Sequence, residues 1–206
     1  MNRERLIPVA GILAVIAVIL AFVIGGETPD GDDSLSKIVR FYRDNDSEQM
    51  IAASFLGWGS ALLMVFAGGF WRLLRNAETE RYGSSTLFVI GATMWAAGAS
   101  IFAGLTFALG DFADDLTPSA MQTLNALNSD MFFTLALGTF GFSMGAGVAV
   151  LKTAVLPKWL GWFAIVIGAL AITPIGFFAI LVMGLWVVIA SVVLLMRSST
   201  PAPAAP

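Results

Sequence analysis

The residues best suited to chemistry in this sequence are four carboxylates at the ends of two long apolar segments. They form a candidate outer acidic cluster, which consists of Asp111, Asp114, Asp115 and Asp130. Carboxylate oxygens bind hard cations, and a bound metal can assist hydrolysis. We interpret this cluster either as a solvated acidic rim or as a candidate cation site. The sequence contains no histidine and no cysteine, so the commonest general base and the thiolate ligands are missing.

Three tryptophans are the candidate lining of a pocket for an apolar ligand. They are Trp58, Trp95 and Trp186, and each lies well inside a charge-free run. The other three tryptophans stand close to basic residues, which is typical of helix ends at the headgroup level of a membrane. The three deeper indoles either line such a pocket or fill the core between helices.

The composition places these residues in a membrane protein. Of the 206 residues, 58% are hydrophobic and 12% are charged, and the mean hydropathy is +0.85. A soluble domain is about 45–50% apolar and about 25% charged. Too few polar residues remain to cover a soluble globule, and the net charge of −3 argues against a nucleic-acid partner.

Charge-free runs define the membrane-spanning elements, because about 20 apolar residues cross a bilayer as a helix. The sequence predicts an all-α, polytopic membrane helix bundle that forms a single domain over residues 1–197. Pro174 divides the last charge-free run, and a re-entrant pair in place of two crossings is the alternative there. We expect residues 198–206, which are rich in proline and alanine, to be disordered. The six predicted spans are about 6–26, 50–71, 86–110, 131–151, 157–173 and 175–196.

Basic residues predict the orientation of these spans. Six crossings place eight lysines and arginines on the side of both termini and three on the other side. Cytoplasmic loops carry such an excess of basic residues. We therefore expect a multi-pass protein of the plasma membrane with both termini in the cytoplasm.

The two outer loops are each predicted to contain a short amphipathic helix. In the second loop, Pro118 follows Thr117, as is typical of the first position after a helix N-cap. These helices either connect span ends or cover an outward-facing cavity. Asn45 begins an N-glycosylation sequon, and its use depends on the host. The first loop places four residues on one helical face: Leu35, Ile38, Val39 and Tyr42.

Small residues at four-residue spacing predict where two of the spans pack. Membrane helices approach closely where small side chains face each other. We expect the third and fourth spans to form a tightly packed antiparallel pair through two stripes. The stripe on the third span is Ala92, Ala96, Ser100, Gly104 and Ala108, and the stripe on the fourth is Gly141, Gly145 and Ala149.

Three segments carry a resemblance to a known group of proteins. They are F-Y-R-D-N (Phe41–Asn45), the stretch from T-P-S-A to L-N-A-L (Thr117–Leu127) and L-P-K-W-L-G-W (Leu156–Trp162). Together they resemble a family of bacterial six-helix integral membrane proteins of unknown function, over most of residues 1–197. The resemblance implies six helices in a bacterial plasma membrane, and it transfers no catalytic or binding residue.

The absence of ionisable and amide side chains from the interiors of the spans narrows the function. Proton pumps, ion-coupled carriers and retinal proteins depend on such residues, and haem needs an axial ligand such as histidine. We therefore expect no catalytic residue, no metal and no cofactor, with metal-assisted chemistry at the outer carboxylates as the one enzymatic alternative. The sequence favours an accessory or scaffold protein that associates with another membrane protein or with a second copy. The alternative is a binder or conductor of a lipid, an apolar small molecule or a cation, through an outward-facing cavity under residues 34–44.

Overall fold

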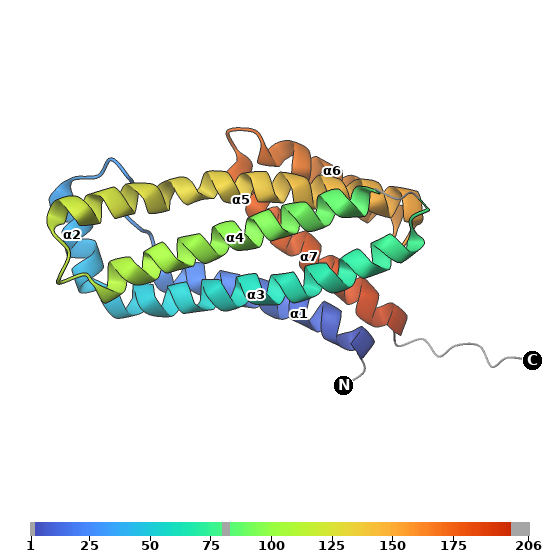
Figure 1. Ribbon diagram of the computed structural model, residues 1–206, viewed down its shortest axis with the longest axis horizontal. Helices are drawn as coiled ribbons and strands as arrows, with labels where there is room; N and C mark the ends of the chain where they lie inside the picture. The colour runs from blue at the N-terminus through green and yellow to red at the C-terminus, as the bar shows by residue number, and fades with distance from the viewer. Residues whose placement is uncertain (1–2, 80–82, 199–206) are drawn as a thin grey trace, which may run out of the picture.

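Helices are the one type of regular secondary structure in the residues that the computed structural model describes, which are 3–79 and 83–198 (Figure 1). This confirms the predicted all-α bundle. The helices are α1 (Arg3–Gly25), α2 (Leu35–Asp44), α3 (Asp46–Ala77), α4 (Ser84–Asp111), α5 (Pro118–Thr153), α6 (Lys158–Ala171) and α7 (Gly176–Ser198).

Five of these helices have the length and apolar composition needed to cross a membrane: α1, α3, α4, α5 and α7. The sixth apolar helix, α6, has 14 residues and therefore rises about 21 Å, which is less than the ~30 Å of a hydrocarbon core. A turn that contains Pro174 separates α6 from α7, as the sequence predicts, because proline cannot donate the backbone hydrogen bond that a continuous helix needs. The choice between a sixth crossing and a re-entrant pair stays a prediction.

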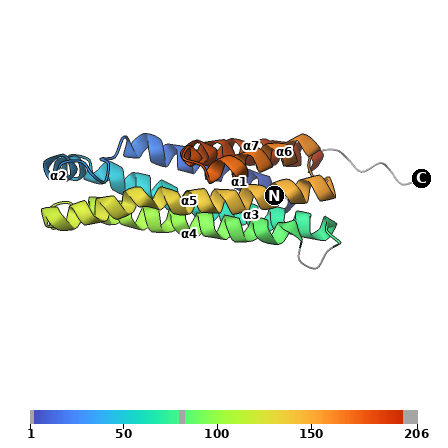
Figure 2. The same cartoon turned by 90° about the horizontal axis from the view of Figure 1, so that it is seen from above.

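The helices form two layers, which Figure 2 shows edge-on. One layer contains α3, α4 and α5, with α4 packed between the other two, and the second contains α1, α7 and α6. The beginning of α1 and the end of α7 lie at the same end of the bundle (Figure 1). The guanidinium of Arg197 donates a hydrogen bond to the carbonyl of Val155, which ties the end of α7 to the α5–α6 connection. Because the start of α1 and the end of α7 lie at the same end, the chain runs from one end of the bundle to the other an even number of times.

Glycines allow the backbones of α4 and α5 to approach closely. An ideal Cβ on Gly91 of α4 would lie 2.0 Å from the backbone nitrogen of Phe142, and one on Gly145 of α5 would lie 2.1 Å from that of Phe88. No side chain fits at such distances. The predicted antiparallel pair of the third and fourth spans is therefore present, with Gly145 at the contact as expected.

Two residues of the predicted stripe on α4 lie outside this contact. Its middle residue, Ser100, reaches α3 instead, where its Oγ lies 2.9 Å from Oγ of Ser60. An ideal Cβ on Gly104 would meet no atom within 4 Å. Two sides of α4 are covered by neighbouring helices, and spacing alone does not distinguish the face that meets α5 from the face that meets α3.

The outer end of the bundle differs from the sequence prediction in one element. The helix that begins at Pro118 is present, with the Thr117 hydroxyl accepting a hydrogen bond from the Ala120 backbone N–H at 3.4 Å. It continues without a break to Thr153, so it is the outer part of α5 and not a separate helix lying on the membrane. Residues 128–130 contain no proline or glycine that would end a helix.

The first outer helix is present as predicted and packs against the outer part of α5. Ile38 and Tyr42 of α2 are fully buried, and they form a small outer core with Leu109, Ala113 and Met121. This contact explains why α2 forms, because a ten-residue helix is only marginally stable without tertiary contacts.

Two helix ends at the opposite side of the bundle are shaped by local chemistry. The buried carboxylate of Glu78 accepts a hydrogen bond of 2.9 Å from the backbone N–H of Ser85, and thus caps the first turn of α4. An ideal Cβ on Gly83 would lie 2.0 Å from this carboxylate, so a larger residue there would displace the Glu78 side chain from its position. Ala154 ends α5 in the left-handed conformation, at φ 53°.

Candidate ligand-binding site

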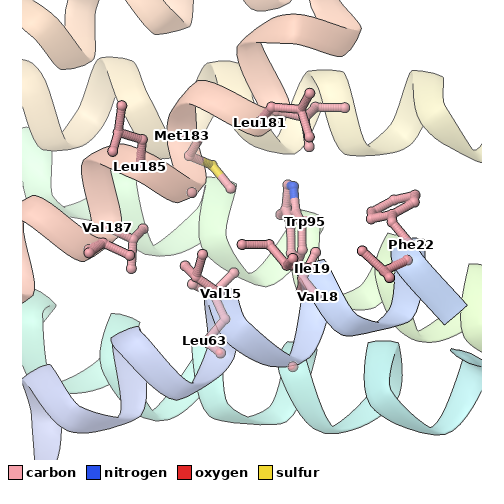
Figure 3. A pocket seen from close by; sticks show the side chains of 16 residues that line it. Val15, Val18, Ile19, Phe22, Leu63, Trp95, Leu181, Met183, Leu185 and Val187 are labelled. Carbon is pink, nitrogen blue, oxygen red and sulfur yellow. The ribbon is translucent and has the colours of Figure 1, made fainter.

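A cavity of about 490 Å³ lies between α1 and α7, and we call it the lateral cavity. Its lining comes from four helices, with Val18 of α1, Leu63 of α3, Trp95 of α4 and Met183 of α7 among the contributors (Figure 3). Apart from the indole nitrogen of Trp95, every lining side chain is apolar. Its volume falls within the range of about 300–1,000 Å³ that is typical of small-molecule sites.

The lateral cavity has a buried floor and an exposed rim. Leu63, Trp95 and Met183 are buried at its floor. Four rim residues are exposed on the lateral surface of the bundle: Ile19, Val23, Leu181 and Leu185. These rim side chains are aliphatic and belong to helices that are long and apolar enough to cross a membrane.

The position of the cavity follows from how α1 and α7 pack. Near the shared end of the bundle, Gly11 of α1 is so close to α7 that an ideal Cβ would lie 2.5 Å from Oγ of Ser191. Further along, α7 diverges from α1 (Figure 1), and an ideal Cβ on Gly184 would still be 3.6 Å from Val15. Gly184 lines the cavity, and α7 has no side chain at this position to fill it.

Trp95 is the one lining residue whose side chain carries a polar atom, and that atom, Nε1, is itself buried. The side chain is only 3% exposed, and its Nε1 has no hydrogen-bond partner in the described protein. Figure 3 shows the indole among the lining side chains that α1 and α7 contribute. By contrast, Nε1 of the equally buried Trp186 donates a 2.9 Å hydrogen bond to the carbonyl of Leu160.

A second cavity of about 230 Å³ lies on the outer side of the lateral cavity, and Phe22 lines both. Its lining is more polar, since it includes Glu27, Gln49 and Thr106. The Gln49 side chain is buried, and its Nε2 donates a 2.7 Å hydrogen bond to the carbonyl of Gly25. The two cavities together change from apolar to polar along the bundle toward its outer end.

The structure does not bring the three candidate tryptophans together. Trp95 lies at the floor of the lateral cavity, but Trp186 is packed in the core among aromatic rings, with its centroid 5.9 Å from that of Phe70. Trp58 is 61% exposed on the surface of α3 and makes an edge contact with Phe55. Their depth in the charge-free runs is similar, but depth does not specify which side of the helix an indole occupies.

The four candidate carboxylates are all exposed. Among the described residues, no group of three or more acidic side chains is arranged to hold a metal ion. Asp114 lies 3.7 Å from the guanidinium of Arg43 on α2. Asp111, Asp115 and Asp130 are likewise outside any such group.

Sequence reasoning missed a buried polar cluster in the outer segment. Tyr42 donates a 2.7 Å hydrogen bond to Oδ1 of Asn125, whose Nδ2 donates to the carbonyls of Pro29 and Asp30 at 3.3 and 3.1 Å. Nearby, Nδ2 of Asn128 donates a 3.2 Å hydrogen bond to Oγ1 of Thr106. The spacing of the two asparagines on one helical face was the available signal, but both precede the predicted fourth span.

Comparisons of the chain with protein families, with curated proteins and with solved structures find no match. The assignment of a function therefore depends on the geometry of the site.

Proposed function

We propose that the protein binds an elongated apolar small molecule, which enters the lateral cavity from the bilayer between α1 and α7. The observation that supports this proposal is a cavity of 490 Å³ with an almost wholly apolar lining. Its rim is exposed on the lateral surface of the bundle. Burial of apolar ligand surface contributes about 25 cal/mol per Å² even where few polar contacts are made. For a ligand that enters from the bilayer this contribution is smaller, because the ligand is already surrounded by hydrocarbon. Selectivity therefore depends on how well the ligand fits the cavity.

The lining favours a neutral ligand over a cation. No carboxylate or other charged side chain is among the residues that line the lateral cavity. An ion would therefore be desolvated there without a partner, at a cost of several kcal/mol. Next to residues 34–44, where the sequence placed a ligand cavity, the buried face of α2 packs on the outer core, which includes Leu109 and Met121. A separate pocket of about 460 Å³ is lined by α2 and its ends, with the charged side chains of Lys37, Arg40 and Asp44 among its lining.

The accessory or scaffold function that the sequence predicts stays a proposal. Among the described residues, no surface feature points to a protein partner as the lateral cavity points to an apolar ligand. Gly57 and Gly68 of α3 would accept a Cβ without contact to any atom within 4 Å. Such small-residue faces allow a helix to approach, but they do not specify which one.

A cavity-filling substitution tests the proposal. Gly184→Leu places an isobutyl group where an ideal Cβ meets only Val15, at 3.6 Å, and should therefore occupy the cavity without a backbone clash. The matched control is Gly104→Leu, which adds the same group to an exposed position of α4 with no atom within 4 Å.

The assay is photolabelling in lipid nanodiscs with a hexadecane that carries a diazirine, followed by mass spectrometry of the labelled peptides. We expect labelling of the floor residues Leu63 and Trp95 in the original protein and in Gly104→Leu, and its loss in Gly184→Leu. Equal labelling of the floor in all three proteins, or labelling of exposed residues alone, would contradict the proposal.

We also propose that the shared end of α1 and α7 faces the cytoplasm of a bacterial plasma membrane. The support is the excess of lysine and arginine at that end. Because the chain has no cysteine, single substitutions report the side directly. A membrane-impermeant maleimide should label Ser36→Cys of α2 on intact cells and should label Ser84→Cys only after lysis, and the reverse pattern would overturn this orientation.

A further inference from the structure

The second cavity of about 230 Å³, which we call the outer cavity, continues the lateral cavity along α1. On α1 the lateral cavity is lined between Ala14 and Val23. The outer cavity begins at Ala21 and extends past the end of the helix to Thr28. Phe22 lines both cavities, and Figure 3 shows it at the edge of the lateral lining. One elongated ligand can therefore reach both cavities, with Phe22 at their junction.

Four phenylalanine rings line the outer cavity, and three of them contact the fourth. Phe132 stacks on Phe22, with the ring centroids 6.3 Å apart. Phe102 and Phe177 each make an edge contact with Phe132, at a centroid distance of 5.4 Å. The face of an aromatic ring attracts a cation, and groups of such rings are known to bind quaternary ammonium ligands. The outer cavity therefore offers aromatic surface that suits an organic cation.

The charge around the outer cavity also favours a cation. Among the described residues that line it, Glu27 alone has a charged side chain, and none is a lysine or arginine. Gly25 and Gly26, at the C-terminal end of α1, line the cavity as well, and the last turn of α1 contains no basic residue. The C-terminal end of a helix carries a partial negative charge, which a nearby cation stabilises. The lining thus supplies negative potential without a positive side chain to balance it.

We propose that the ligand is a cationic amphiphile, whose alkylammonium headgroup lies in the outer cavity near Glu27 and the phenylalanine rings and whose hydrocarbon chain lies in the lateral cavity. This inference rests on the proposed function and adds the chemical class of the ligand. The lateral cavity has no charged lining residue, so it accepts the neutral chain and the charge lies in the outer cavity. A carboxylate or phosphate headgroup would be repelled by Glu27 and would find no basic partner in the lining.

Ligands that share one chain and differ in the headgroup test the inference. The assay is competition with the diazirine-labelled hexadecane for labelling of Leu63 and Trp95, in nanodiscs of neutral lipid. The competitors are hexadecyltrimethylammonium, hexadecanol and hexadecanoate, each quantified as its mole fraction in the bilayer. We expect the ammonium to compete at an about tenfold lower mole fraction than hexadecanol, because an exposed ion pair and a cation–π contact together have this magnitude. Hexadecanoate should compete most weakly.

Two substitutions separate the contributions of charge and rings. Glu27→Gln should weaken competition by the ammonium about threefold and leave competition by hexadecanol unchanged. The matched control, Glu48→Gln, removes an exposed carboxylate of α3 that is not part of either lining, and it should change neither competitor. Phe177→Leu replaces a ring that is 46% exposed with an apolar side chain, and it should also weaken the ammonium selectively, about threefold.

The possible outcomes distinguish this inference from the proposed function. If all three competitors displace the label and hexadecanol or hexadecanoate is as effective as the ammonium, the headgroup inference is wrong and the proposed apolar site stands. If the floor residues are not labelled in the original protein, the proposed function itself is wrong. Equal effects of Glu27→Gln and Glu48→Gln would assign the preference to general surface charge, which would also overturn the inference.

Discussion

The hydrogen bond between Tyr42 and Asn125 is expected to hold the outer segment together. It joins α2 to the outer part of α5 over 2.7 Å between two buried side chains. Tyr42→Phe removes the donor and leaves Oδ1 of Asn125 buried without it. A net hydrogen bond contributes about 0.5–1.5 kcal/mol, and an unsatisfied buried acceptor costs about 1–3 kcal/mol. We therefore expect α2 to be destabilised by about 2 kcal/mol relative to its docked state.

Hydrogen exchange measures this local opening directly. A loss of about 2 kcal/mol raises the exchange rate of amides in α2 roughly thirtyfold, because 1.4 kcal/mol corresponds to a factor of ten. Amides in the central part of α4 should keep their rates, since the bond lies outside that segment. A double-mutant cycle with Asn125→Ala isolates the pair, and we expect a coupling energy of about 1 kcal/mol.

Two results would refute this reasoning. An exchange rate in α2 that changes less than twofold in Tyr42→Phe would show that the hydrogen bond does not anchor the helix. Additive effects of the two substitutions would show that Tyr42 and Asn125 act on stability independently.

Three further predictions concern the ends of helices and the response to pH. Glu78→Ala should lower the free energy of unfolding by about 1–2 kcal/mol, because α4 loses its cap. Glu78→Gln should lower it less, because the amide oxygen can still accept the hydrogen bond from Ser85. Denaturation in detergent measures both variants, and equal losses of stability would contradict capping. Ala154→Gly should raise the melting temperature, because glycine adopts the left-handed conformation without the cost of about 1–2 kcal/mol that a Cβ brings. An unchanged or lower melting temperature would contradict this reasoning. Burial raises the pKa of Tyr42 above its usual value near 10, so its contribution to stability is complete below pH 10 and is lost as the pH rises further. Alkaline titration of the unfolding free energy should show this decline in the original protein and a weaker one in Tyr42→Phe.

Several elements could be predicted from the sequence because they depend on local properties of the chain. The absence of charge marks the apolar helices, since ionised groups are excluded from hydrocarbon. The turn near Pro174 and the helix start after Thr117 follow from backbone chemistry that does not need a partner. The buried face of α2 was visible because Ile38 and Tyr42 repeat with the helical period.

The continuity of α5 shows where local reasoning fails. The charge of Asp130 bounded the predicted fourth span at residue 131 and suggested a separate outer helix before it, but Asn125 and Asn128 are buried there with hydrogen-bond partners. Those partners are supplied by α2, α4 and the segment before α2, so they are distant in the sequence. A polar residue that is satisfied by distant groups is indistinguishable in the sequence from one that is solvated.

Tertiary structure alone decided the candidate site. The sequence determined that Trp95 lies deep in an apolar helix, as do Trp58 and Trp186. Only the packing of α4 against its neighbours and the divergence of α7 from α1 placed one of these indoles at a cavity floor, one in the core and one on the surface. The physical reason is that hydrophobicity sets the depth of a side chain in the bilayer. Which neighbours that side chain contacts is set by the relative tilt and rotation of whole helices, and these depend on contacts across the entire bundle.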